Sequence, residues 1–133
     1  MSDSRRRVVI TGLGAITPVG HDVPSTWGAL LAGETGAGPI TLFETTEQYV
    51  TRIACEVKNF DPLTFLEKKE ARRYDRFAQF SIGAAVEAMR DAGLVGAPDA
   101  VTPERFGVIF GSGIGGISTM EAQHDQLKDR GPS

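Results

Sequence analysis

The 133-residue sequence predicts an α/β fold in which helices cover a parallel sheet. Two observations indicate this class. Short runs rich in Val and Ile alternate with longer segments whose apolar residues recur every three or four positions. This alternation is typical of strand–helix–strand units. About three strands are expected, and so small a parallel sheet leaves edges and faces uncovered. We therefore expect the fold to be incomplete on its own.

The N-terminal half contains two expected strands and two expected helices. Residues 6–11 form a β-branched run closed by glycine, which is typical of a central strand. Residues 24–32 predict a helix that Ser25 or a neighbour caps. Residues 51–57 predict a second strand, and the Asp-Pro pair before residues 63–66 predicts a short helix. Three residues form the apolar stripe of the first helix: Trp27, Leu30 and Leu31.

The C-terminal half has the clearest helical pattern, over residues 75–92, where Gly93 follows as a stop signal. The apolar face of this helix carries mostly small residues, so another element is expected to approach it closely. Residues 106–110 predict a third strand. Residues 116–127 predict the helix that follows it.

The composition excludes several classes of function. The formal net charge of −3 argues against general nucleic-acid binding, which needs a basic surplus. No apolar run approaches the length of about 18 residues that a membrane span needs. The single cysteine, Cys55, excludes an internal disulfide and fits a reducing cytoplasm. Its alternating, strand-like surroundings predict a small buried core thiol.

A glycine run, Gly111-Ser-Gly-Ile-Gly-Gly116, has the G-x-G-x-x-G spacing of a dinucleotide-binding loop. Such a loop should be followed, about 20 residues later, by an acidic residue at a strand end. Only 17 residues follow Gly116, and Asp125 and Asp129 fall in the expected helix. A glycine-rich turn that passes close to another element is the simpler interpretation. An NAD(P)-binding oxidoreductase domain stays open as an alternative.

Four blocks of sequence occur in a fixed order: "RRVVITGLGAITPVG", "STWGALLAGETGAGPI", "RRYDRFAQFSIGAAVEAMRDAGL" and "GVIFGSGIGG". Together they resemble the β-ketoacyl-acyl-carrier-protein synthases, especially type II of the bacterial elongating enzymes. The resemblance covers essentially the whole chain. It implies that residues 1–133 are the N-terminal portion of a β-ketoacyl synthase N-terminal domain, within a thiolase-like α/β/α/β/α fold.

The resemblance implies that the full-length protein is an acyltransferase of fatty-acid synthesis. It is expected to be a cytoplasmic homodimer that needs no cofactor. Such enzymes condense an acyl group with malonyl-acyl carrier protein and release carbon dioxide. In the family, a cysteine thiolate takes the acyl group, and two histidines assist decarboxylation and stabilise the enolate and oxyanion. These three residues are expected beyond residue 133, so no catalytic residue is expected within the chain. Cys55 is not expected to replace the nucleophile. His21 and His124 lack metal-ligand spacing and are expected to be solvated, so no metal site is expected.

Two groups of residues are candidates for function. Lys69, Arg72, Arg73 and Arg76 have the spacing of one helix face. The resemblance implies that Lys69, Arg72 and Arg73 bind the acidic acyl carrier protein; a merely solvated face is the alternative.

The second group is in the glycine run. The resemblance implies that this run lies beside the acyl pocket, where Gly113 admits close approach and Ile114 lines or gates the deep end. A plain core role for Ile114 is the alternative. A further alternative for the whole chain is a non-catalytic relative, such as a chain-length factor or a docking module.

Overall fold

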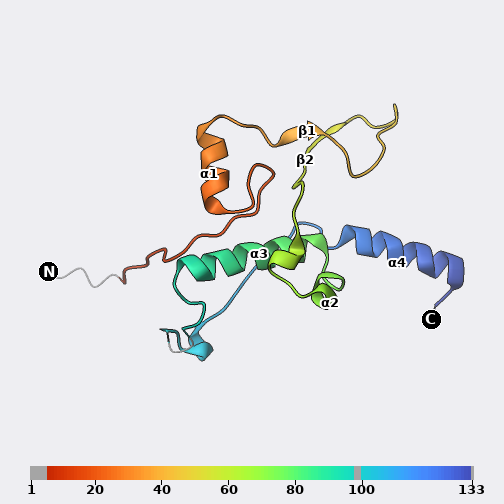
Figure 1. Cartoon of the computed structure of the whole chain (residues 1–133). Coiled ribbons are helices and arrows are strands. Elements are labelled where there is room, and N and C mark those ends of the chain that lie inside the picture. The colour runs from red at the N-terminus through yellow and green to blue at the C-terminus, as the bar shows by residue number, and fades with distance from the viewer. Residues whose placement is uncertain (1–5, 98–99, 133) are drawn as a thin grey trace.

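The computed structural model describes residues 6–97 and 100–132. Helix α3 (Arg76–Asp91) is the element against which the N-terminal segment and the short helices of residues 62–71 lie (Figure 1). The other elements, in chain order, are α1 (Val23–Leu31), β1 (Ala37–Pro39), β2 (Ile53–Cys55), the 3-10 helix η1 (Pro62–Thr64), α2 (Lys68–Ala71), the 3-10 helix η3 (Pro103–Arg105) and α4 (Ile117–Arg130).

Helix α3 confirms the predicted helix over residues 75–92 to within one residue at each end. Asp75 precedes it with extended backbone, and Gly93 follows the helix with a φ of +67°, a conformation that glycine adopts without strain. The expected close neighbour of the small-residue face is present. Gly83 is buried, and a Cβ built on it would lie 3.2 Å from the Phe65 ring.

Two further glycines let the N-terminal segment cross α3 at backbone contact distance. A Cβ built on Gly12 would lie 2.6 Å from the amide nitrogen of Ala92, and one on Gly14 would lie 2.8 Å from that of Ala88. Real Cβ atoms do not approach so closely, so any other residue would push the segment off the helix. The small residues of α3 and the glycines of the N-terminal segment therefore form one contact.

Two carboxylates of α3 anchor the same segment. The Leu13 amide donates to Oδ2 of Asp91 at 2.9 Å, and the Ala15 amide donates to Oε2 of Glu87 at 2.8 Å. The other oxygen of Glu87 accepts from the amide of Val23, the first residue of α1, at 2.7 Å. Glu87 thus satisfies a free N–H at the start of α1 and links that helix to α3.

Helix α1 confirms the helix expected over residues 24–32, and of the expected caps, Ser25 or a neighbour, the structure has the nearby Asp22. Oδ1 of Asp22 accepts a hydrogen bond from the Ser25 amide at 2.7 Å. Ala29 is the buried residue of this helix. The expected apolar stripe exists in sequence but is more than half exposed at all three positions: Trp27, Leu30 and Leu31.

The sheet differs from the predicted one. Strand β2 lies within the strand expected over residues 51–57, but it pairs in an antiparallel sense with β1, which the sequence did not predict. Ala37 is opposite Cys55, and Pro39 is opposite Ile53. Among the residues described, this two-stranded sheet is the only sheet.

The strands predicted over residues 6–11 and 106–110 are wrong as secondary structure, because both segments run as coil (Figure 1). Their apolar side chains are also exposed: Ile10 at 81% and Ile109 at 97%. A strand needs a neighbour for its N–H and C=O groups, and within residues 6–97 and 100–132 no segment pairs with either run.

An aromatic cluster lies between α3 and the segment around η1. Phe60, which is 8% exposed, packs edge-to-face on Phe80 at 5.0 Å and stacks with Phe65 at 6.1 Å between ring centroids. Burying one such ring contributes about 1.5–3 kcal/mol. The helix expected over residues 63–66 is the 3-10 turn η1, with Asp61 at its N-cap.

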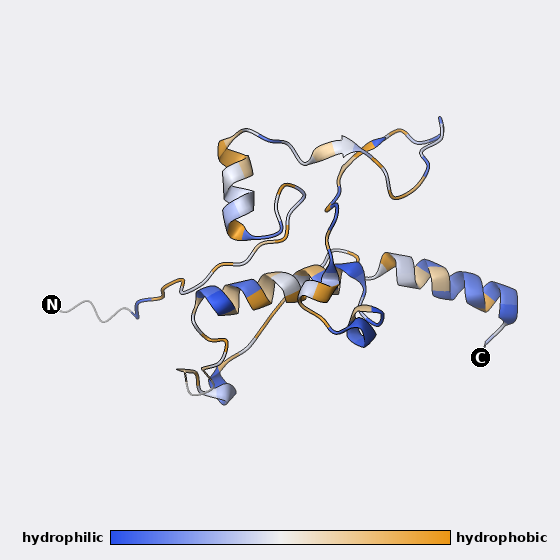
Figure 2. Ribbon diagram, viewed as in Figure 1, coloured by the Kyte–Doolittle hydropathy of each residue, from blue (hydrophilic) through white to orange (hydrophobic). Residues whose placement is uncertain are grey.

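Apolar residues are spread along the chain, whereas α4 is largely hydrophilic beyond its first turn (Figure 2). Helix α4 begins one residue later than expected and extends to Arg130. None of the described helices combines the length and the apolar character that a membrane crossing requires.

Candidate functional site

The three predicted carrier-binding residues, Lys69, Arg72 and Arg73, lie in and just after α2, and we call them the basic turn. All three are exposed. The sequence predicted that they share one helix face. They do not, because α2 ends after one turn and Arg72 is its C-cap. The basic turn is instead a bend between two helices.

The bend is held by α3. The Gln79 side-chain amide donates to the carbonyl of Ala71 at 2.8 Å and to that of Tyr74 at 3.0 Å. These two carbonyls bracket Arg72 and Arg73, so the backbone that carries the guanidinium groups is fixed at both ends. None of the three basic side chains forms an ion pair with another residue that the structure describes. Their charges face solvent.

Arg76 is not part of this surface, although the sequence placed it on the same face. Its guanidinium donates to the carbonyl of Val57 at 2.7 Å and lies 4.8 Å from the centroid of the Phe80 ring. This geometry is a cation–π contact against the aromatic cluster. Arg76 therefore tethers the chain after β2 to α3.

The glycine loop, residues 111–116, lies before α4. Ile114 is 67% exposed, and a Cβ built on Gly113 would meet nothing within 4 Å. Ile114 therefore has no core role among the described residues. Gly115 has a φ of +76°, and its amide donates to the Ser112 hydroxyl at 3.0 Å, which shapes the turn.

The start of α4 does not suit a pyrophosphate. The Asp75 carboxylate accepts a hydrogen bond from the Thr119 hydroxyl in the first turn of α4. It also fills the space that a side chain at Gly116 would take. A helix N-terminus attracts anions, but here the negative Asp75 carboxylate lies beside the first turn of α4, where it would repel a phosphate. This contact disfavours the dinucleotide-binding alternative.

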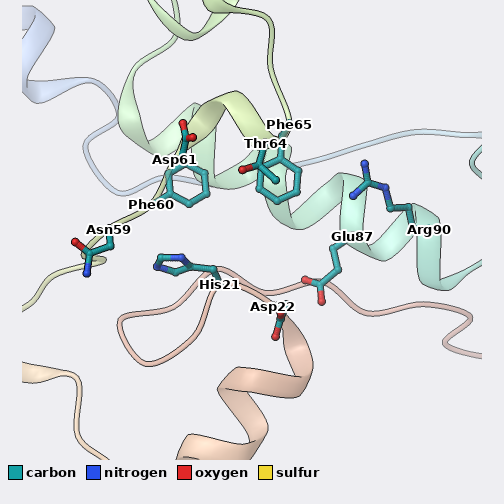
Figure 3. A pocket seen from close by; sticks show the side chains of 9 residues that line it. All are labelled: His21, Asp22, Asn59, Phe60, Asp61, Thr64, Phe65, Glu87 and Arg90. Atoms are coloured by element: carbon teal, nitrogen blue, oxygen red, sulfur yellow. The ribbon is translucent and has the colours of Figure 1, made fainter.

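A groove of about 380 Å³ lies between α3, the loop before α1 and the segment around η1 (Figure 3). No sequence pattern indicated it. His21, expected to be solvated, is half-buried and packs edge-to-face on Phe60 at 5.8 Å. Figure 3 shows Glu87 pointing from α3 toward the loop of His21 and Asp22.

The polar groups of this groove are engaged in holding the chain. Glu87 accepts the two backbone hydrogen bonds described above. Hydrogen bonding by Ser25, through its side chain first and then its amide, lowers the pKa of Asp22 below its ordinary value. Both carboxylates therefore serve α1 and its connection to α3.

The expectation that Cys55 is buried is wrong, since its side chain is exposed at the end of β2. The short antiparallel pair leaves that position open to solvent. His124 is exposed on α4 as expected, with Nδ1 at 3.7 Å from Oδ1 of Asp125. Within the described part of the chain, no three His, Cys, Asp or Glu residues form a group that could hold a metal ion.

Comparison with known proteins gives consistent matches. A family model described as beta-ketoacyl synthase, N-terminal domain, matches residues 5–132. Proteins named 3-oxoacyl-(acyl-carrier-protein) synthase 2 from Synechocystis sp. and Staphylococcus aureus are 45% and 50% identical to the chain, over 129 and 127 residues. These alignments cover 97% and 96% of this chain and 30% of each relative. The chain thus spans less than a third of the length of these relatives.

Solved structures agree. "The ishigamide ketosynthase/chain length factor" matches with a TM-score of 0.74 and 32% identity, over 96% of this chain and 31% of that one. A second structure is "AntDE:AntF (apo): type II PKS acyl-carrier protein in complex with its ketosynthase bound to the hexaketide". It matches with a TM-score of 0.69 and 28% identity, over 96% and 33% of the two chains. These matches confirm the fold class, an incomplete N-terminal part of a thiolase-like α/β fold.

Proposed function

Because the chain belongs to the family of the beta-ketoacyl synthase N-terminal domain, we propose that it is the N-terminal segment of a condensing enzyme. The reaction is elongation of an acyl chain by decarboxylative Claisen condensation. Malonyl-acyl carrier protein loses carbon dioxide, the resulting enolate carbon attacks the acyl thioester carbonyl, and the enzyme thiolate leaves. The observation that carries this proposal is the 45–50% identity to 3-oxoacyl-(acyl-carrier-protein) synthases across nearly all of the chain.

In this proposal, the catalytic cysteine and histidines lie outside residues 1–133, and the chain contributes recognition. The glycine loop lines the acyl pocket through Gly113 and Ile114. The exposure of Ile114 supports this role, because an apolar side chain that the described residues leave uncovered is available to an apolar ligand. The open space at Gly113 leaves room for close approach.

The basic turn is the proposed docking site for acyl carrier protein. Three exposed cations without an ion-pair partner among the described residues, on a backbone fixed by Gln79, suit an acidic partner. One structural relative is a ketosynthase in complex with its acyl-carrier protein, which supports this class of partner. We place the intact protein in the cytoplasm as a homodimer.

Charge reversal tests the docking proposal. Changing Lys69, Arg72 and Arg73 to Glu in the intact protein should raise the KM for acyl carrier protein several-fold to about a hundredfold at low salt, because attraction becomes repulsion. The effect should shrink as salt rises. Arg105→Glu is the charge control, since Arg105 is exposed in η3. A KM that matches this control at low salt contradicts docking at the basic turn.

A non-catalytic chain-length factor is the second candidate, because one matched structure is titled a ketosynthase/chain length factor. Intact mass after incubation with acyl-acyl carrier protein separates the two candidates. A condensing enzyme gains one acyl group on a cysteine other than Cys55. A non-catalytic relative gains none.

A further inference from the structure

A contact between residues 44 positions apart joins the starts of α3 and α4. Thr119, in the first turn of α4, donates its hydroxyl hydrogen to Oδ1 of Asp75, the residue before α3. The Asp75 carboxylate lies where a side chain of Gly116 would be. The missing side chain at Gly116 is what admits the carboxylate.

This contact fixes one end of the glycine loop. A Cβ on Gly115 would lie 4.0 Å from the ring of Phe77, which is in the first turn of α3. Gly115 and Gly116 are therefore both held against the start of α3. Gly113, earlier in the loop, would meet nothing within 4 Å, and Ile114 is mostly exposed. The position of Ile114 is thus set from the anchored end.

The basic turn adjoins the same anchor. Arg72 and Arg73 precede Asp75 by three and two residues, and Gln79 binds the carbonyl of Tyr74 between them and Asp75. The start of α3 therefore adjoins both the proposed docking cations and the proposed pocket loop.

We propose that Asp75 and Thr119 are positioning residues that hold Ile114 where it limits the length of the bound acyl chain. This inference rests on the proposed function of the loop. Neither residue touches the acyl chain. Their hydrogen bond resists a shift of the loop, so its loss lets Ile114 move away from a long chain and weakens the discrimination between chain lengths.

A double-mutant cycle in the intact protein tests the inference. Thr119→Val replaces the hydroxyl with a methyl group of similar shape, and Thr119→Ser keeps the hydroxyl. Ser118→Ala is the control, because Ser118 is an exposed neighbour in the same helical turn. Each change is made alone and together with Ile114→Phe. The measured quantity is the ratio of condensation rates for long and short acyl primers.

Ile114→Phe alone should lower that ratio. In the Thr119→Val background, the decrease in this ratio caused by Ile114→Phe should be at least about threefold smaller. The reason is that substitutions acting through one contact do not have additive effects. With Thr119→Ser or Ser118→Ala the drop should stay as in the parent. An undiminished drop with Thr119→Val overturns the inference and confines the contact to the stability of α4.

The proposed function of the loop fails separately, if Ile114→Phe leaves the ratio unchanged. Hydrogen exchange of the amides of residues 111–116 then still tests the positioning contact in the intact protein. Exchange that is faster with Thr119→Val and with Asp75→Ala than with Ser118→Ala supports it. Equal exchange in all three variants overturns it.

Discussion

Removal of the Glu87 carboxylate should loosen the connection between α3, the N-terminal segment and α1. Glu87→Ala deletes two hydrogen bonds to a charged acceptor, from the amides of Ala15 and Val23 at 2.8 and 2.7 Å. Such bonds contribute about 1.5–3 kcal/mol each when desolvated. Glu87 is half-buried, so water partly replaces the lost acceptor. We expect a loss of about 2 kcal/mol in the free energy of unfolding.

Urea unfolding of the intact protein measures this loss. The loss should appear as a lower urea midpoint, because the midpoint is the free energy of unfolding divided by a slope that depends on the surface exposed on unfolding. Glu87→Gln keeps one acceptor oxygen, but its side-chain NH2 group would face the second backbone N–H, and two donors cannot form a hydrogen bond. The Glu87→Gln protein should therefore also be less stable than the parent. Glu121→Ala, at an exposed position of α4, is the matched control and should change stability by less than about 0.5 kcal/mol. A Glu87→Ala midpoint equal to that of Glu121→Ala refutes the reasoning.

Three further predictions concern the glycine loop, the cap of α1 and the exposed thiol. Ile114→Phe should slow condensation of long acyl primers more than that of short ones, because each methylene excluded from the pocket loses about 0.8 kcal/mol of burial free energy. The melting temperature should not change. A uniform loss of rate across primer lengths would mean that Ile114 only packs in the core. The lowered pKa of Asp22 means that its contribution to stability is complete above its unfolded pKa, near 3.9, and is lost as pH falls through the lower folded value. Asp22→Asn keeps a good N-cap but has no charge to lose on acidification. Urea unfolding should therefore show that the variant is less stable than the parent at neutral pH and that this difference shrinks below about pH 4. A difference that is constant from pH 3 to 6 contradicts this. Cys55→Ser should leave formation of the acyl-enzyme intact by mass spectrometry, and loss of the adduct would identify Cys55 as the nucleophile.

The local features of the fold were predictable because they depend on neighbours in the sequence. The three- and four-residue periodicity located α3, and its small residues indicated a close neighbour. The identity of that neighbour was not predictable, since the backbone contact of Gly12 and Gly14 with α3 joins residues 70 or more positions apart. The predicted strands failed for the same reason. Residues 6–11 and 106–110 have strand-like composition, but pairing depends on what lies beside them.

The candidate site shows the same division. Composition identified Lys69, Arg72 and Arg73 as a basic group and correctly expected them at the surface. The assumption of one continuous helix also included Arg76, whose guanidinium is engaged with Phe80 and the Val57 carbonyl. The groove at His21 gave no signal, because its walls come from three separate segments.

The anchoring of residues 13–23 by α3 has a consequence for the order of events during synthesis. The hydrogen bonds of this segment join residues 64, 72 and 78 positions apart. At about 5–20 residues per second, a ribosome adds Glu87 and Asp91 roughly 3–16 s after the amides that they bind. During that interval the glycines of the segment have no helix to contact, because α3 has not yet been synthesised. Helix α3 forms from local contacts far faster than this delay, so the wait for synthesis of α3 limits when residues 13–23 can take up their folded position.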